Sequence, residues 1–285
     1  MVKEAVLLVA VLAMSGLPGF PAAAAPAQPS VGCGTAPPAR PPAAVRVGGR
    51  WRGVIVAVPD SYDPTRPHAV TVAFHGRTNS NAQVRRYFNL ERNADGPTIF
   101  VYPAGRQGRD GRYTWADPGD RPGALRDFAL FDAALDAVAR RYCIDRGAVH
   151  VVGHSLGASF ANSLACARGA VIRGVATVGG GIARPADCSG PVAAMVLHNP
   201  RDRLVPVSEG YRVRRSLLAQ NGFDTGSVPA EPRRFNCRRY GPEDAANPVL
   251  WCPHADDRTR TGRFYPHQWP AGTGAAIMGF FAELG

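Results

Sequence analysis

Six short apolar runs recur along the chain, and each stops at a glycine, a proline or a polar residue. Four other segments have helical character, and in the first of them apolar side chains recur every three or four residues. Short buried strands that alternate with helices predict an α/β fold, in which a mostly parallel central sheet carries helices on both faces. The expected strands are residues 54–58, 69–74, 98–102, 148–152, 171–178 and 192–198, and the expected helices are residues 124–142, 155–168, 207–218 and 273–284.

The stretch VVGHSLGASF, residues 151–160, places a Gly-x-Ser-x-Gly pattern between an expected strand and an expected helix. Such sheets keep their chemistry beyond the carboxyl ends of the strands, and a sharp strand-to-helix turn there raises a serine hydroxyl above the sheet. Glycines on either side of the serine avoid collisions with the neighbouring backbone, and the start of the helix directs N–H groups at the site. We therefore predict that Ser155 is a nucleophile rather than an ordinary turn residue.

A serine hydroxyl needs a base to take its proton, and in this type of sheet the chain order is Ser, then Asp or Glu, then His. That order leaves His254 and His267 as candidate bases. We favour His267, which precedes the last expected helix, where the final loop should return over the serine. The acid should follow the strand at 192–198, which assigns Asp202 to hold the imidazole in the required tautomer.

An oxyanion produced at Ser155 needs two backbone N–H donors. One should be the amide of Leu156, directly after the nucleophile, and the other the amide of Arg77, in the loop FHGRTN after an early strand. Gly76 would let this loop approach the substrate closely. His75 is expected to brace the loop by hydrogen bonds rather than to transfer protons.

Aromatic residues near these loops are candidates for a substrate pocket. We assign Trp115 and Trp269 to substrate binding, with His75 beside them, and Tyr113 could line the same pocket. The alternative is that these rings pack in the core or at its rim.

Several stretches resemble a known group of proteins. FHGRT, YCIDRGAVHVVGHSLGA, HNPRDRLVP, VLWC and HQWP are similar to segments of the secreted polyhydroxybutyrate depolymerase and feruloyl esterase group of α/β-hydrolases. The resemblance runs from about residue 50 to the C-terminus. It implies a serine esterase with the α/β-hydrolase fold that cleaves feruloyl or acetyl esters of polysaccharides, or short hydroxyacid polyesters. Carried over by motif, Ser155, Asp202 and His267 would be its triad, and an acyl-enzyme mechanism needs neither a metal nor an organic cofactor.

Two other functions remain open. The same three residues could transfer the acyl group to an alcohol or a sugar, which would make the protein an acyltransferase. Alternatively, the chain could be a non-catalytic protein that binds surfaces through its arginines.

The first residues are typical of an export signal. Lys3 precedes an apolar stretch, and small residues follow it, so residues 1–27 are expected to be a cleaved signal peptide of a secreted protein. An uncleaved anchor is the alternative, and we expect no stable membrane anchor after cleavage. Residues 28–45 are Pro-rich and expected to be poorly ordered, and residues 46–285 are expected to form one catalytic domain, active as a monomer.

The six cysteines are even in number, which suits disulfides in an exported protein. None lies in a Cys-x-x-Cys pair, so we expect no zinc site. Cys237 with Cys252 is the local choice, and Cys166 with Cys188 and Cys33 with Cys143 would complete the set, although the sequence alone allows fifteen full pairings.

The formal net charge is +11, and every basic residue after Lys3 is an arginine. A basic surface can bind nucleic acids, anionic polymers or membranes. The arginines are scattered, apart from short pairs, and no basic helix or aromatic-interleaved stripe is present. We therefore expect no nucleic-acid partner, and a solvated Arg-rich surface around a site for an ester substrate.

Overall fold

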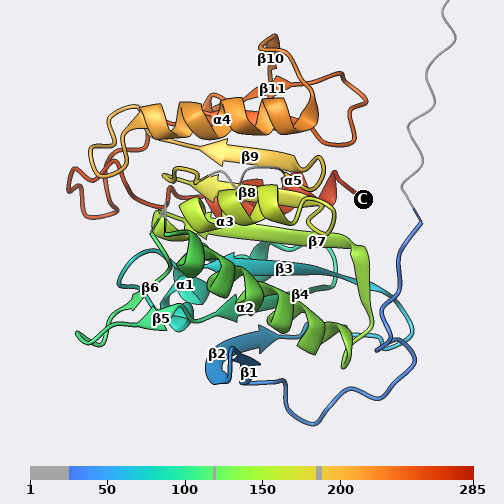
Figure 1. Cartoon of the computed structure of the whole chain (residues 1–285). Coiled ribbons are helices and arrows are strands. Elements are labelled where there is room, and N and C mark those ends of the chain that lie inside the picture. Colours follow the sequence, from blue (N-terminus) through green and yellow to red (C-terminus); the bar gives the residue numbers. More distant parts are fainter. Residues whose placement is uncertain (1–25, 118–119, 184–187) are drawn as a thin grey trace, which may run out of the picture.

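The computed structural model describes residues 26–117, 120–183 and 188–285, and within them ten strands form one large sheet (Figure 1). The strand order is β1-β2-β4-β3-β7-β8-β9-β12-β11-β10, and the six central strands from β4 to β12 run parallel. The strands are β1 (Ala44–Val47), β2 (Arg50–Ala57), β3 (His68–Phe74), β4 (Thr98–Pro103), β7 (Ile144–His154), β8 (Gly174–Val178), β9 (Ala193–Leu197), β10 (Ser227–Pro229), β11 (Arg238–Tyr240) and β12 (Val249–Cys252).

Helices cover both faces of the sheet, as the alternation of apolar runs predicts. Successive residues of a strand face opposite sides, so β4 sends Ile99 and Val101 to one core and Phe100 and Tyr102 to the other. The first core also takes side chains from α2, α3 and α4, and the second from α1 and α5. The helices are α1 (Asn81–Phe88), α2 (Arg121–Ala139), α3 (Leu156–Ala167), α4 (Val207–Asn221) and α5 (Thr273–Ala282), with short 3₁₀ turns η1 (Glu91–Asn93) and η2 (Arg233–Phe235).

Each strand expected from the sequence corresponds to a strand of the sheet, but several bounds differ. β7 begins at Ile144 rather than at residue 148, because Ile144 pairs with His68 of β3 before a register shift between residues 144 and 149. α2 begins at Arg121 rather than at residue 124, where the side chain of Asp120 accepts a hydrogen bond from the amide of Gly123 at 3.0 Å. A small hairpin, β5 (Arg106–Gln107) and β6 (Tyr113–Thr114), lies outside the main sheet.

The segment before the sheet is held against the domain, so the expectation that it is poorly ordered is wrong around Cys33. Ser30 is buried, and its hydroxyl donates to the carbonyl of Tyr142 at 2.8 Å. Cys33 forms a disulfide with Cys143, and the other two bonds join Cys166 to Cys188 and Cys237 to Cys252. All three pairings chosen from the sequence are thus confirmed. Of the signal peptide expected at 1–27, residues 1–25 lie outside the described part of the chain.

No helix among the described residues is long and apolar enough to cross a membrane. The carboxyl ends of β3, β7, β8 and β9 lie side by side on one edge of the sheet, because these strands are neighbours and run parallel. The loops that follow them carry the residues singled out from the sequence, so this edge is where a site has to be sought.

Candidate active site

Ser155 lies at a sharp turn between β7 and α3. Its backbone has φ 57° and ψ −125°, a strained conformation for a residue with a side chain, and its amide donates to the carbonyl of Val178 on β8 at 2.9 Å. The flanking residues Gly153 and Gly157 must be glycines, because a side chain at either position would collide with neighbouring backbone atoms. A Cβ on Gly153 would lie 2.3 Å from the carbonyl oxygen of Gly157, and a Cβ on Gly157 would lie 2.3 Å from that of Phe74. The tight turn therefore needs both glycines, and it lifts the Ser155 side chain to the sheet edge.

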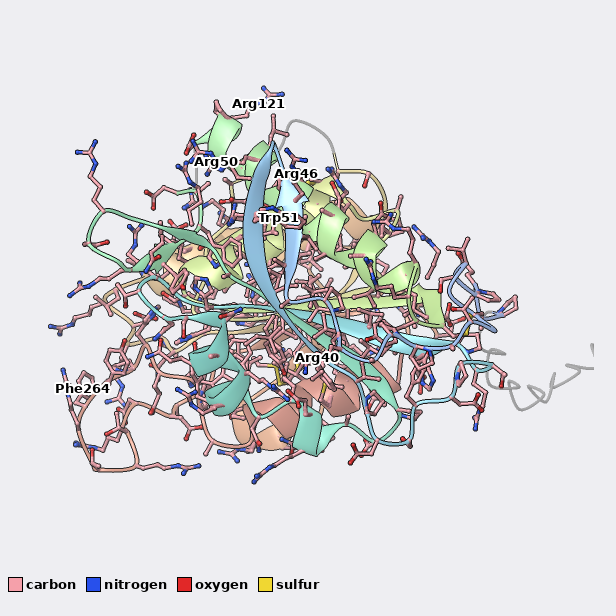
Figure 2. The ribbon with its side chains drawn as sticks, turned by 90° about the horizontal axis from the view of Figure 1, so that it is seen from below. Arg40, Arg46, Arg50, Trp51, Arg121 and Phe264 are labelled. Carbon is pink, nitrogen blue, oxygen red and sulfur yellow. A yellow bond between two sulfur atoms is a disulfide. The ribbon has the colours of Figure 1, made fainter. Side chains whose placement is uncertain are left out.

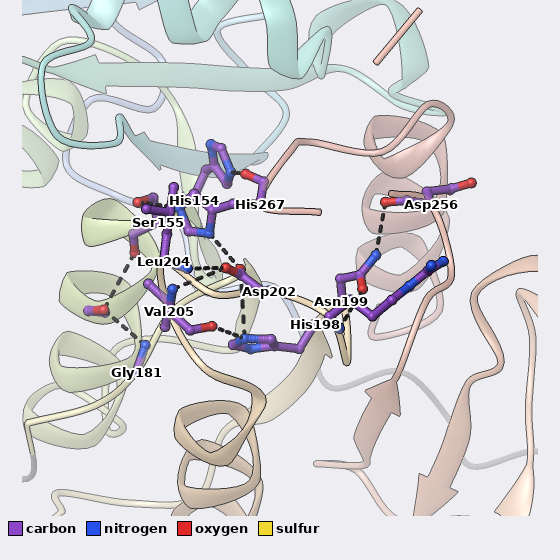
Figure 3. Close-up of polar contacts among 12 residues, drawn as sticks. His154, Ser155, Gly181, His198, Asn199, Asp202, Leu204, Val205, Asp256 and His267 are labelled. Carbon is purple, nitrogen blue, oxygen red and sulfur yellow. Dashed lines mark hydrogen bonds and ion pairs between the residues drawn. The ribbon is translucent and has the colours of Figure 1, made fainter. Parts of the chain in front are cut away.

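Ser155, His267 and Asp202 meet at this edge, although they are far apart in the sequence (Figure 3). The hydroxyl of Ser155 donates to Nε2 of His267 at 2.7 Å, and Nδ1 of His267 donates to Oδ2 of Asp202 at 2.6 Å. The structure thus brings together the three residues chosen from the sequence. His254 is buried beside Phe235, and in the described part of the chain the Ser155 hydroxyl has no other histidine partner.

Asp202 is held as a charged acceptor. Its other oxygen, Oδ1, accepts from the amides of Leu204 and Val205 at 2.9 and 3.0 Å. Burial opposes the charged form, but the hydrogen bond and charge of His267 and these two amides outweigh it, so the pKa of Asp202 lies below its ordinary value. Gly179, with φ 61°, leaves room for the pair: a Cβ there would lie 3.2 Å from Nδ1 of His267.

The residue before the serine holds the loop that carries His267. Nε2 of His154 lies 3.0 Å from the carbonyl oxygen of His267, and its Nδ1 lies 3.2 Å from the hydroxyl of Tyr87. Burial lowers the pKa of His154 to about 3, so the ring is neutral at ordinary pH. Sequence reasoning excluded His154 as the base by chain order and assigned it no other role. Its place within the Gly-x-Ser-x-Gly pattern was the one available signal.

Further contacts join the loop of Asp202 to the segment that leads to His267. The side-chain amide of Asn199 donates to the carbonyl of Asp256 at 3.0 Å, and Arg201 forms an ion pair with Asp257. Nε2 of His198 donates to the carbonyl of Val205 at 2.8 Å. These bonds fix the two loops relative to each other, and therefore the acid relative to the imidazole (Figure 3).

The two residues chosen from the sequence to supply oxyanion donors, Leu156 and Arg77, directly follow Ser155 and Gly76 in the chain. Leu156 is the first residue of α3, where an N–H has no acceptor within the helix. Arg77 follows Gly76, whose Cα faces the serine so closely that an added Cβ would lie 3.4 Å from that of Ser155. The side chain of Arg77 pairs with Asp117.

His75 and Trp115, both assigned to substrate binding from the sequence, are buried. Nδ1 of His75 donates to the carbonyl of Gly76 at 2.8 Å, and its Nε2 accepts from the amide of Gly105 at 2.9 Å, while burial lowers the pKa of His75 to about 4. The indole N–H of Trp115 donates to the carbonyl of His75 at 2.8 Å. Both side chains brace the loop around Gly76, which agrees with the bracing role expected for His75.

The other two aromatic candidates are partly exposed. Trp269 stacks on Phe88, with ring centroids 3.8 Å apart, and borders a cleft described below. Tyr113 lies at the edge of the His75 ring, 5.9 Å between centroids. In the described residues no group of three or more His, Cys, Asp or Glu side chains is arranged to hold a metal ion.

Comparison with known proteins finds esterases among the relatives of this chain. The chain is 28% identical to feruloyl esterase C of Emericella nidulans over 178 residues, which are 60% of this chain and 62% of that protein. It is also 28% identical to feruloyl esterase D of Neurospora crassa over 272 residues, 88% of each chain. The match to the first relative thus spans less than two thirds of that protein's length. No family model matches the chain.

Solved structures share the fold at low sequence identity. The carboxylesterase of Bacillus cereus superimposes with a TM-score of 0.59 at 15% identity and covers 82% of this chain and 95% of its own. An acetyl xylan esterase from Aspergillus awamori gives a TM-score of 0.59 at 14% identity and covers 81% and 94%. Both the expected fold class and the expected resemblance are confirmed. The chain is an α/β-hydrolase in fold, and its sequence is related to those of feruloyl esterases.

Proposed function

We propose that the protein is a secreted serine esterase that hydrolyses carboxylic esters of saccharides through an acyl-enzyme. The observation that carries the proposal is the unbroken chain of two hydrogen bonds from the Ser155 hydroxyl through His267 to Asp202, at 2.7 and 2.6 Å. A serine in this arrangement can lose its proton as it attacks, which an isolated serine cannot do at neutral pH.

In the acylation step, Oγ of Ser155 bonds to the carbonyl carbon of the ester while Nε2 of His267 takes the hydroxyl proton. The negative charge moves to the former carbonyl oxygen, where the amides of Leu156 and Arg77 would donate hydrogen bonds. The bond to the alcohol oxygen then breaks, and Nε2 returns the proton to the leaving alkoxide. The acyl group remains as an ester of Ser155.

In the deacylation step, a water molecule replaces the alcohol. Nε2 of His267 takes a proton from the water as its oxygen attacks the acyl carbon, and returns it to Oγ of Ser155 when the acid leaves. Asp202 accepts from Nδ1 throughout and stabilises the imidazolium that forms twice in each cycle. The two amides bonded to its Oδ1 keep it charged and fixed in place.

The substrate class rests on the relatives. Two curated relatives are named as feruloyl esterases and one structural neighbour as an acetyl xylan esterase. We infer that the ester is a feruloyl or acetyl group on a polysaccharide. Export is supported by the three disulfides, which form and persist in oxidising compartments.

The test compares the wild type with Ser155→Ala on p-nitrophenyl acetate, methyl ferulate and acetylated xylan. We expect the wild type to hydrolyse at least one of them and the variant to lose kcat by roughly 10⁶-fold. Ser208→Ala is the matched control, since this hydroxyl is exposed in the first turn of α4. Equal rates for wild type and Ser155→Ala would overturn the proposal.

Acyl transfer is separated from hydrolysis by the products. With an added sugar acceptor, a hydrolase releases free ferulate or acetate, and a transferase forms a new sugar ester. A wild type that turns over no ester and binds polysaccharide as well as Ser155→Ala does would indicate a non-catalytic binding protein.

A further inference from the structure

A cleft of about 850 Å³ lies beside the candidate active site and plays no part in the mechanism above. Its walls come from three segments: the end of α1, the η1 turn, and the loop on either side of His267. Trp269 forms part of the wall and is partly exposed. The cleft is therefore a second concave surface next to the serine, and its lining needs an explanation.

The lining is strongly cationic. Four arginines border the cleft: Arg86, Arg92, Arg258 and Arg260. The one carboxylate in the lining, Asp256, pairs with Arg234 at 3.3 Å and leaves the four charges unbalanced. Among the described residues, none of the four forms an ion pair, whereas the neighbouring Arg85 is paired with Glu91 at 2.7 Å. Four like charges around one hollow repel each other, which an anionic ligand would relieve.

The cleft is continuous with the machinery around the serine. Gln268 and Trp269, which line it, directly follow His267 in the chain. Tyr87, another lining residue, donates to Nδ1 of His154, the neighbour of Ser155. The rings of Trp269 and His154 have centroids 6.0 Å apart. A polymer seated in the cleft would therefore contact the loop that carries His267 and the tyrosine bonded to His154.

We propose that this cleft is a carboxylate-binding subsite, which holds a uronic acid unit of the polysaccharide whose ester reaches Ser155. The inference rests on the proposed function, because it names the polymer that carries the ester. A planar guanidinium matches the two oxygens of a carboxylate. Trp269, which stacks on Phe88, adds an apolar part to the wall of the cleft. Neutral xylan would leave the four arginines without a carboxylate partner.

Binding without turnover gives the first test. Ser155→Ala is titrated calorimetrically with trigalacturonate and with xylotriose. We expect trigalacturonate to bind, and its affinity to fall as the salt concentration is raised from 50 to 500 mM. Xylotriose should bind at least about tenfold more weakly. Equal affinity for the two trisaccharides would overturn the proposal. Because this measurement needs no catalysis, it separates a failure of the subsite from a failure of the esterase assignment.

Substitution of two cleft arginines gives the second test. Arg92→Gln with Arg260→Gln removes charge from η1 and from the loop, and both side chains are exposed, so the fold should persist. On acetylated oligogalacturonate we expect KM to rise about tenfold with kcat unchanged. On acetylated xylo-oligosaccharide and on p-nitrophenyl acetate we expect the KM and kcat of the variant to equal those of the wild type. A similar rise in KM on neutral and acidic substrates would overturn the subsite.

The matched control changes the same net charge at a distance. Arg50 on β2 and Arg121 at the start of α2 do not line the cleft, and Figure 2 shows both apart from Phe264, whose loop flanks it. Arg50→Gln with Arg121→Gln should leave KM for acetylated oligogalacturonate within twofold of the wild type. If this control raises KM as much as the cleft variant does, the arginines act only through the overall charge of the protein, and the subsite proposal is wrong.

Discussion

Nε2 of His154 donates to the carbonyl oxygen of His267 at 3.0 Å across 113 residues of sequence. A carbonyl oxygen can only accept, so Nε2 carries the ring hydrogen and Nδ1 is free to accept from the hydroxyl of Tyr87. His154, which directly precedes Ser155, therefore holds the backbone of His267 in place. The turn from β7 into α3, which contains His154 and Ser155, thus positions both partners of the Ser155–His267 hydrogen bond.

His154→Leu should lower kcat on p-nitrophenyl acetate by at least about tenfold, because the loop of His267 loses its anchor and a 1 Å displacement of a catalytic group is costly. His154→Gln keeps a donor near the position of Nε2 and should recover most of that loss. Steady-state kinetics of both variants, with thermal unfolding as the control for general stability, check this. If both variants keep the wild-type kcat, His154 has no positioning role.

Buried histidines make the protein sensitive to acid. Burial and the charge of Arg173 lower the pKa of His150 to about 3, and its ring is stacked on Phe281 at 4.3 Å. The unfolded chain would protonate this histidine near pH 6.5, so between about pH 6.5 and 3 the unfolded state binds one more proton than the folded state. The free energy of unfolding should therefore fall as the pH falls through this window, by about 1.4 kcal/mol per pH unit for this one group.

His150→Leu isolates this effect, since His150 lies outside the candidate site and its Nε2 has no hydrogen-bond partner among the described residues. We expect the variant to unfold at higher urea than the wild type at pH 5, and the gap to shrink toward pH 7. Urea titrations at pH 5, 6 and 7 measure it. If the difference in urea midpoint between variant and wild type is the same at all three pH values, the protonation of His150 does not change on unfolding.

The alternation of apolar runs was sufficient to predict five of the six parallel strands, because parallel strands buried on both faces must be apolar along their length. The sixth, β12, was missed, since it is only four residues long. The outer strands β1, β10 and β11 were also missed, since they are three or four residues long and β11 carries Arg238 and Arg239. The helix α1, NAQVRRYF, was missed because it is short and its apolar face is only Val84 and Phe88.

The candidate site was likewise predictable in part from the sequence. Chain order and the elbow pattern were enough to select Ser155, Asp202 and His267, which the fold brings within hydrogen-bond distance. The bracing role of His75 was predicted, but the position of Trp115 could not be read from the sequence, because an aromatic ring in a pocket and one beneath a loop have the same local sequence. Only the packing around Gly76 distinguishes them.

Asp202→Asn should lower kcat by about 10⁴-fold while KM changes little. An asparagine cannot balance the imidazolium, and its NH₂ group would favour the tautomer that places the hydrogen on Nε2, where the serine proton has to go. Asp224→Asn, in an exposed loop, is the matched control and should behave as the wild type. Turnover of p-nitrophenyl acetate measures both, and a loss of less than tenfold in Asp202→Asn would assign the acid elsewhere.

Gly157→Ala and Gly279→Ala should have opposite effects on stability. A Cβ on Gly157 would lie 2.3 and 2.4 Å from the carbonyl oxygens of Phe74 and His75, which are backbone atoms held by the sheet and the loop after it. They cannot move without displacing Gly76, so we expect a loss of several kcal/mol in the free energy of unfolding and a large loss of activity. On α5, a Cβ on Gly279 meets nothing within 4 Å, and alanine should stabilise that helix by about 1 kcal/mol. Urea unfolding of both variants measures the difference. A neutral Gly157→Ala would mean that the turn around Ser155 is wider than this packing allows, and the hydroxyl would then lie too far from His267 for the reaction proposed here.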